Sequence, residues 1–317
     1  MNAEYSEISV GDVLPEFRRT TDLANWNRYA AVNDEFVPIH MDGDAARAAG
    51  QKDVFGMGNL RISYMHNTLR SWLGSRGDIV DFEVEFRGLN FKGDQLSATA
   101  VVSGKELRDG HQLVHLTLGV KNQDGKNTAP GKATVQLFDG SPRVMPSPEP
   151  RATTGQGKLG RYLEQRCLDR VGETTASQHS LAVGANDIRR WAIACYYPEP
   201  PPPNFYDEEP AAQCPWGGLV APREFNPFAW MTNYRLGDPW LRGMRNEPGY
   251  RVLNGGQRNR YFAPLRPGDV VSETSRLADV YEKEGRMGTM LFFVNERRWT
   301  NQHGDLLRVG NQTTLYY

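Results

Sequence analysis

The stretch NLRISYMHNTLRSW, residues 59–72, carries apolar side chains near helical spacing. It is followed by the segments 79–88, 95–107 and 111–121, which are rich in Val, Leu, Phe and Thr and alternate with polar residues. Gly-Asp and Asp-Gly turns separate these segments, as expected of antiparallel strands. One long helix followed by a run of strands predicts an α+β fold, in which a curved antiparallel sheet wraps around a central helix.

The same features return, in the same order, later in the chain. Matching short stretches are VGD (10–12) and VGE (171–173), FGMGNL (55–60) and WGGLVA (216–221), and NQDGK (122–126) and NQHGD (301–305). Strand-like segments recur at 258–265, 270–282, 286–300 and 306–316, and we expect the second helix near 223–235. Ordered matches of this kind indicate a duplicated unit.

Residues 141–160, SPRVMPSPEPRATTGQGKLG, are dominated by Pro, Ser, Gly and Thr and lack apolar periodicity. This composition is typical of a linker. The total of 317 residues suits two domains of roughly 150 residues each. We therefore predict a first domain over 1–140, a linker over 141–160 and a second domain over 161–317.

The composition excludes several classes of protein. With 37 Lys+Arg against 38 Asp+Glu, the net charge is −1, and no basic block would attract nucleic acid. No apolar run approaches the roughly 18 residues that a membrane span needs, and the N-terminus does not resemble a secretory signal. Three widely spaced cysteines favour neither a disulfide framework nor a metal clamp. We expect a reduced, cytoplasmic protein without a bound metal.

The densest cluster of polar side chains with catalytic potential is YAAVNDEFVPIHMD, residues 29–42. A carboxylate at Asp34 or Glu35, followed by His40 across a turn fixed by Pro38, can place an acid and a base on one water molecule. A helix end followed by a solvated loop would show the same acids, so the spacing alone leaves both interpretations open.

This segment resembles the signature of the MaoC-type, (R)-specific enoyl-CoA hydratases of the hot-dog fold, roughly Y-A-x-x-S-G-D-x-N-P-I-H-x-D. The matching positions are Tyr29, Ala30, Pro38, Ile39, His40 and Asp42. The stretch LNGGQRNRYFAPLRPGDVV, residues 253–271, is similar to the dehydratase region of fungal fatty acid synthase. Together the resemblances imply two tandem hot-dog domains that form a pseudo-dimer.

The chain departs from the family pattern beside the histidine. The family's catalytic aspartate falls at Glu35, its asparagine at Val37, and a usual glycine at Asp34. Two interpretations stay open: Glu35 replaces the aspartate, or a remodelled loop turns Asp34 inward. Asn33 joins the set as a candidate substrate-binding residue.

The resemblance implies reversible hydration of a trans-2-enoyl-CoA, with His40 and the carboxylate acting on one water molecule. The thioester oxygen gains negative charge and needs backbone N–H donors at a helix N-terminus. Gly56 is the first candidate donor and Gly58 the second. The coenzyme A thioester is the substrate, and we expect no metal and no other cofactor.

The second half has Phe205 where the first has His40, so we expect it to shape the acyl pocket rather than to catalyse. Candidate pocket residues are Trp216, Phe225, Phe228 and Trp230, although core packing explains the same aromatics. A homodimer follows from analogy with the fold. The alternatives are a hot-dog thioesterase and a non-catalytic acyl-CoA-binding subunit of a larger complex.

Overall fold

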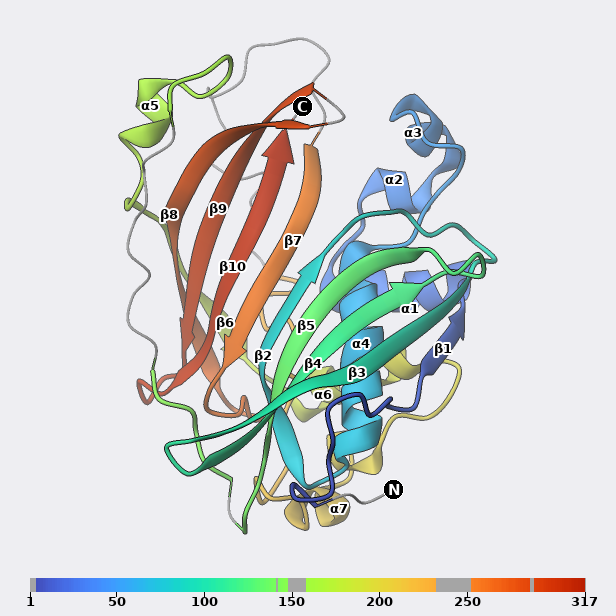
Figure 1. Ribbon diagram of the computed structural model, residues 1–317, viewed down its shortest axis with the longest axis vertical. Coiled ribbons are helices and arrows are strands. Elements are labelled where there is room, and N and C mark those ends of the chain that lie inside the picture. Colours follow the sequence, from blue (N-terminus) through green and yellow to red (C-terminus); the bar gives the residue numbers. More distant parts are fainter. Residues whose placement is uncertain (1–3, 141, 148–157, 232–251, 286–287, 317) are drawn as a thin grey trace.

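The protein is built around one ten-stranded antiparallel sheet, seen in a computed structural model that describes residues 4–140, 142–147, 158–231, 252–285 and 288–316 (Figure 1). The strands of the first half are β1 (Phe17–Thr20), β2 (Gly77–Glu85), β3 (Gln95–Arg108), β4 (His111–Lys121) and β5 (Asn127–Leu137). Those of the second half are β6 (Thr174–Ala182), β7 (Val252–Tyr261), β8 (Val270–Gly285), β9 (Gly288–Thr300) and β10 (Leu306–Tyr316).

The two halves of the sheet repeat each other. The strand order is β1-β3-β4-β5-β2 in the first half and, in mirrored sequence from the outer edge, β6-β8-β9-β10-β7 in the second. The halves join where β2 pairs with β7, from Asp81 opposite Arg260 to Glu85 opposite Gly256. The α+β prediction and the duplication are thereby confirmed. The strand predicted over 258–265 corresponds to β7, which begins six residues earlier, at Val252.

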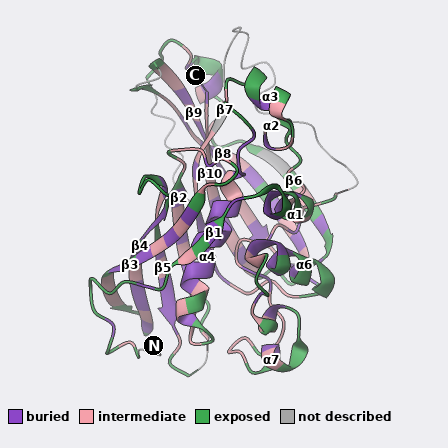
Figure 2. Ribbon diagram, turned by 90° about the vertical axis from the view of Figure 1, so that its right-hand side faces the viewer, coloured by how far each residue is buried: buried purple, intermediate pink, exposed green. Residues whose placement is uncertain are grey.

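Helix α4 (Gly58–Leu73) confirms the helix predicted over 59–72 and lies against one face of β2, β3 and β4 (Figure 1). Most of its residues are buried, including the polar His66, Asn67 and Thr68. Figure 2 shows the same burial on α4 and at alternate positions of the neighbouring strands. The polar side chains of a buried helix need hydrogen-bond partners inside the protein. The junction between the halves therefore contains polar contacts as well as apolar packing.

The other helices lie on the same side of the sheet as α4 or at its ends. They are α1 (Leu23–Asn33), α2 (Pro38–Met41), α3 (Gly43–Ala48), α5 (Gln165–Leu168), α6 (Ala185–Tyr196), the 3-10 helix η1 (Pro203–Phe205) and α7 (Glu208–Ala212). The helices over 185–196 and 203–212 thus follow the order of α1 to α3, with the 3-10 helix η1 in the place of α2. None of the helices that the structure describes is long and apolar enough to cross a membrane.

The helix expected near 223–235 is wrong over 223–231, which forms turns and irregular backbone. Residues 232–235 lie outside the described residues. Pro222 and Pro227 account for the difference, since each lacks an N–H donor and disfavours helix in the residue before it. The linker over 141–160 stays a prediction, since only 142–147 and 158–160 of it are described, and they form no helix or strand.

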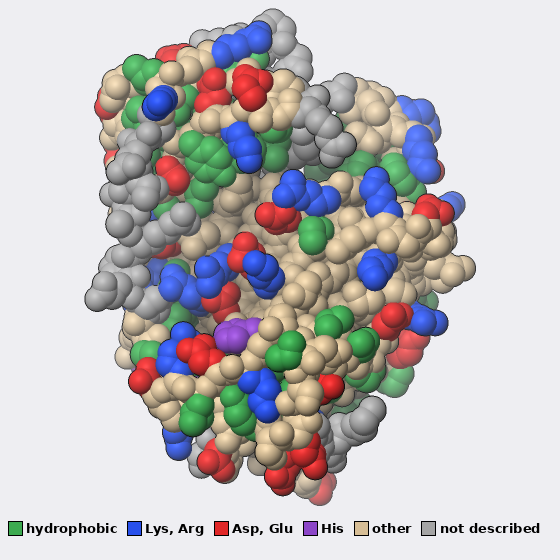
Figure 3. Space-filling view, in the orientation of Figure 1, with side chains coloured by type: hydrophobic (Ala, Val, Ile, Leu, Met, Phe, Trp, Pro, Cys, Tyr) green, Lys and Arg blue, Asp and Glu red, His purple; other side chains and the backbone are tan. Residues whose placement is uncertain are grey.

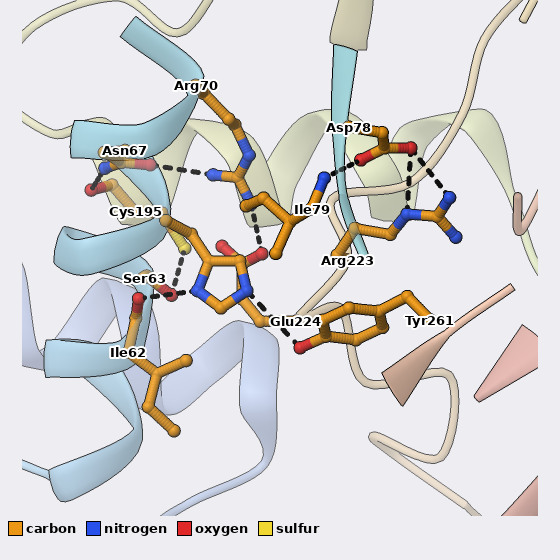
Figure 4. A network of polar contacts seen from close by, with 11 residues as sticks. Ile62, Ser63, Asn67, Arg70, Asp78, Ile79, Cys195, Arg223, Glu224 and Tyr261 are labelled. Carbon is orange, nitrogen blue, oxygen red and sulfur yellow. Dashed lines mark hydrogen bonds and ion pairs between the residues drawn. The ribbon is translucent and has the colours of Figure 1, made fainter. Parts of the chain in front are cut away.

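A network of polar side chains joins α4 to the second half (Figure 4). Arg70 of α4 pairs with Glu224 and donates to Asn67, whose own amide donates to the carbonyl of Cys195 on α6. Beside it, both guanidinium nitrogens of Arg223 that face Asp78 of β2 lie within 3.0 Å of that carboxylate. The main apolar core also contains residues from both halves, so the halves share one interior.

Candidate active site

The loop between α1 and α2 carries the predicted acid and base. Helix α1 ends at Asp34, whose left-handed backbone (φ 53°) lets the Glu35 N–H return to the carbonyl of Ala30 at 3.0 Å. Aspartate tolerates this conformation better than most residues. Pro38 then occupies the first position of α2, where its missing N–H costs nothing. The short helix α2 places His40 in the interior.

The buried His40 is held in one tautomer. Its Nδ1 lies 2.7 Å from the carbonyl oxygen of Phe55, and because a carbonyl only accepts, the proton sits on Nδ1. The other nitrogen, Nε2, therefore carries the lone pair in the neutral ring. Burial, with a smaller effect of the Arg61 charge, lowers the pKa of His40, while the Phe55 contact opposes this. The ring is thus a neutral base near pH 7.

The pKa of the Glu35 carboxyl group is shifted in the opposite direction, above its usual value. Burial raises the pKa of Glu35 to about 7, against two hydrogen bonds that favour its charged form. These bonds come from Asn33 Nδ2 at 2.7 Å and Asn59 Nδ2 at 3.3 Å, and both reach Oε2. The cleft that both residues line therefore holds a carboxyl group with a pKa of about 7 and a neutral imidazole.

Glu35 and His40 line one cleft of about 1400 Å³ that reaches from the first half into the second. Its walls include the ends of β2 and β7, and it extends over β8, β9 and β10. Figure 3 shows a hollow between the two halves with basic and acidic side chains side by side around it. The basic groups are partly neutralised, since Arg258 pairs with Asp81 and Arg87 with Glu85.

The two glycine candidates differ in what they offer a substrate. The N–H of Gly56 already donates to the Asn90 carbonyl at 2.9 Å, and a Cβ there would lie 2.4 Å from the Asn90 amide. Gly58 is the first residue of α4, where N–H groups have no partner within the helix and no side chain caps them. Both glycines line the cleft, and the geometry favours Gly58 as the donor.

The remaining predicted residues lie outside the cleft lining. Asp34 caps α1, and its Oδ2 lies 3.3 Å from the backbone N of Trp230. Asn33 does not line the cleft but donates a hydrogen bond to the Glu35 carboxyl group. None of the four aromatic candidates lines the cleft with His40.

The four aromatic side chains have other partners. Trp216 donates to Asp78 at 2.9 Å, and Phe225 packs edge-on against Trp191 in the core. Phe228 packs against Trp299. Trp230 is 61% exposed and packs against Phe36. The core-packing alternative therefore describes Phe225 best.

Three functional residues were not foreseen from the sequence. Asn59 holds Glu35, and Gln257 of β7 donates to Asn59 at 3.2 Å. Arg61 is 3% exposed in the cleft wall and donates to the carbonyls of Gly88 and Thr128. The available signal was the pair of polar residues, Asn59 and Arg61, in the first turn of the helix that follows the glycine candidates. Among the described residues, no group of three or more His, Cys, Asp or Glu could hold a metal ion.

Two five-stranded antiparallel units joined into one sheet are the arrangement of a double hot-dog fold. The MaoC like domain family matches residues 10–124, and the FAS1-like, dehydratase domain region matches residues 169–309. The chain thus has a double hot-dog fold whose first half matches the MaoC like domain and whose second half matches the FAS1-like dehydratase region, which confirms the resemblance stated from the sequence. No curated protein matches the sequence.

Solved structures agree on the fold. A MaoC domain dehydratase from Chloroflexus aurantiacus is 10% identical with a TM-score of 0.68, covering 98% of this chain and 96% of that one. RV0216 from Mycobacterium tuberculosis, a double hot-dog protein, is 13% identical with a TM-score of 0.63 and covers 100% and 99%. A MaoC-like dehydratase is 14% identical with a TM-score of 0.63 and covers 96% and 97%.

Proposed function

We propose that this protein is a hydro-lyase that reversibly hydrates a trans-2-enoyl-CoA to a 3-hydroxyacyl-CoA. The observation that carries the proposal is the matched pair in the cleft: a neutral His40 with its lone pair on Nε2, and a Glu35 whose pKa burial raises to about 7. General acid–base catalysis works best with groups whose pKa values lie near the operating pH.

In hydration, His40 Nε2 removes a proton from water as the water oxygen attacks C3. The protonated Glu35 then delivers a proton to C2, and dehydration runs through the same groups in reverse. The thioester oxygen gains negative charge and accepts from the N–H of Gly58 at the positive end of α4. The thioester of coenzyme A is the substrate, and no further cofactor enters these steps.

We also propose a bulky acyl group as the substrate. The cleft volume of about 1400 Å³ exceeds the roughly 300–1,000 Å³ of common ligand pockets. Part of the apolar lining comes from strands β8, β9 and β10, where Tyr281 and Phe292 stack with ring centroids 4.9 Å apart. The homodimer stays a separate prediction.

The test is a panel of trans-2-enoyl-CoAs, from short linear to bulky cyclic, followed by loss of the conjugated-enoyl absorbance. We expect His40→Ala and Glu35→Gln to lower kcat by about 10²–10⁴-fold, because each removes one proton-transfer group. Asp34→Asn retains most of the activity, since an amide oxygen can still accept from Trp230. This control separates the two acids that the sequence left open.

Two other outcomes would replace the proposal. Release of free coenzyme A thiol, abolished by Glu35→Gln, would indicate a thioesterase. Binding of enoyl-CoA without turnover in any variant would indicate a non-catalytic subunit. Full activity in His40→Ala would contradict the assignment of the base.

A further inference from the structure

A chain of amides from the second half ends on the Glu35 carboxyl group. Asn226, in the segment after Pro222, donates from Nδ2 to Asn33 Oδ1 at 3.0 Å and to the Asn33 carbonyl at 3.3 Å. Asn33 Nδ2 then donates to Glu35 Oε2 at 2.7 Å. We call Asn226 and Asn33 the first amide relay. It connects the second half of the chain to the proposed acid through two hydrogen bonds.

A second chain of amides reaches the same oxygen from strand β7. Asn259 donates to Gln257 Oε1 at 3.5 Å, and Gln257 Nε2 donates to Asn59 Oδ1 at 3.2 Å. Asn59 Nδ2 donates to Glu35 Oε2 at 3.3 Å. These three residues form the second amide relay. The two amide relays come from different elements and share only Glu35.

The direction of each amide follows from its predecessor. An amide presents one acceptor and one donor group, so a donor bound at Oδ1 of Asn33 or Asn59 leaves the NH₂ facing Glu35. Both amide relays therefore supply neutral donors to Oε2 and none to Oε1. Neutral donors fix the orientation of a carboxyl group without the strong acidifying effect of a nearby cation.

The segment that starts the first relay is itself anchored to the catalytic loop. Trp230 Nε1 donates to the carbonyl of Ala31 at 2.6 Å, and its ring packs edge-on to Phe36 at 5.8 Å. Phe36 directly follows Glu35 in the chain. The residues before and after Glu35 are thus both held by residues 226–230 of the second half.

We propose that the second half is a working part of the active site, in which Asn226 and Gln257 are positioning residues that orient the Glu35 carboxyl group through two amide relays. The inference rests on the proposed role of Glu35 in hydration. It gives the second half, which has Phe205 in place of His40, a function besides shaping the cleft. It also explains how Glu35 is held although Val37 stands where the family has an asparagine.

Isosteric carboxylates at the start of each relay test this proposal. In Asn226→Asp the new carboxylate only accepts, so Asn33 turns its NH₂ toward it and its oxygen toward Glu35. An oxygen acceptor beside Oε2 favours the protonated acid. In Gln257→Glu the same reversal occurs at Asn59. Both variants should therefore raise the pKa of Glu35.

Other charged and titratable groups interact with Glu35 or line the same cleft, and they stay in place in these variants. Tyr29 on α1 interacts with Glu35 and with Glu224, which lies in the segment before Asn226. His40 on α2, Arg61 on α4, Glu83 on β2 and Arg258 on β7 line the cleft. None of them donates a hydrogen bond within an amide relay. A new carboxylate also acts through space, so a control must carry the same charge.

Asn254→Asp is the matched control. Asn254 lines the same cleft on β7 but belongs to neither relay, and its side-chain oxygen accepts from the Gly256 N–H at 3.1 Å. An aspartate oxygen can accept the same bond. The substitution thus adds a negative charge to the cleft while leaving both relays intact.

The measurement is a ¹³C NMR titration of the Glu35 carboxyl carbon in the full-length protein labelled at glutamate, with Glu35→Gln used to assign the signal. We expect a midpoint near 7 in the wild type. Asn226→Asp and Gln257→Glu should each raise it by about one unit, and Asn254→Asp by much less. Where a variant turns over substrate, the alkaline limb of its rate profile should move up with the midpoint.

Equal midpoints in the relay variants and in Asn254→Asp would overturn the proposal. Asn226 and Gln257 are both partly exposed. The two amide relays are independent, so if one variant does not fold, the midpoint measured for the other variant still tests the proposal. The titration needs no turnover. A protein that lacks hydratase activity but shows the shift would therefore refute the proposed function and leave the positioning by the second half intact.

Discussion

At the residue scale, one backbone angle separates the two candidate acids. The sequence places Asp34 and Glu35 side by side before His40, and their spacing suits either. The left-handed conformation at Asp34 ends α1 and directs its carboxylate to Trp230, while Glu35 turns into the cleft. The sequence pointed to His40 and to this pair of acids, but which acid faces the cleft depends on a φ angle that the residue types do not reveal.

The expected pH dependence of hydration follows from the shifted pKa values of His40 and Glu35. Hydration needs His40 neutral and Glu35 protonated. Burial lowers the pKa of His40 below 6.5, so its neutral form persists into mildly acidic solution. Burial raises the pKa of Glu35 to about 7, so its acid form is lost above that value. We expect a bell-shaped profile of kcat/KM for hydration, with its alkaline limb near pH 7.

Steady-state rates across the neutral range, with one enoyl-CoA at low concentration, measure this profile. Dehydration needs the opposite protonation of the same pair, which also holds one proton in total, so its profile has the same limbs. In Glu35→Gln the residual rate should lack the limb near 7. A wild-type rate that keeps rising into alkaline solution would contradict the assignment of Glu35 as the acid.

At the element scale, α4 shows what apolar periodicity can predict. Its spacing predicted a helix with nearly the right ends, yet gave no sign that the helix is enclosed by the second half. Two of its polar residues, Asn67 and Arg70, find partners in α6 and in the segment 221–226, most of which the repeat had suggested would be a helix. That segment forms a turn and irregular backbone because Pro222 and Pro227 disfavour a helix, and its charges bind α4 and β2 instead.

The Arg70–Glu224 pair in Figure 4 permits a test of this junction. The Glu224 side chain is 6% exposed, so Glu224→Ala leaves the Arg70 guanidinium largely buried without its carboxylate. We expect a loss of about 3 kcal/mol in the free energy of unfolding, measured by urea denaturation. The double variant Arg70→Met, Glu224→Leu should be more stable than either single change, because it leaves no unpaired charge.

The exposed pair of Arg47 and Asp44 on α3 is the control for this series. Removing one partner of a solvated pair has little effect on stability. If Glu224→Ala loses no more free energy of unfolding than Asp44→Ala does, the Arg70–Glu224 pair does not hold the halves together.

At the scale of the whole molecule, duplication was visible in the sequence, but the sharing of one interior was not. Short ordered matches such as NQDGK and NQHGD indicated two units. They carried no information on how far the units interpenetrate. In the structure Trp191 of the second half packs between Tyr29 and Phe225, with ring centroids 5.5 Å and 5.4 Å away. Such contacts depend on side chains far apart in the sequence, which no local pattern encodes.

A shared core and a continuous sheet predict that the two halves unfold together. We expect one thermal transition, with equal calorimetric and van't Hoff enthalpies, although the chain has the length of two domains. Gly256→Ala tests the seam between β2 and β7. The residue has φ 145°, and a Cβ there would lie 2.4 Å from the Val84 carbonyl oxygen. If the halves are one cooperative unit, this change lowers the whole transition instead of splitting it.

Gly304→Ala provides the comparison, since Gly304 also has a positive φ but a Cβ there meets nothing within 4 Å. It should lower the transition less than Gly256→Ala, because only backbone strain is added. Two separate transitions in Gly256→Ala, one of them at the wild-type temperature, would mean that one half folds without the other. The amide relays would then have to form after folding, when the finished halves dock, and the loop holding Glu35 would order only at that step.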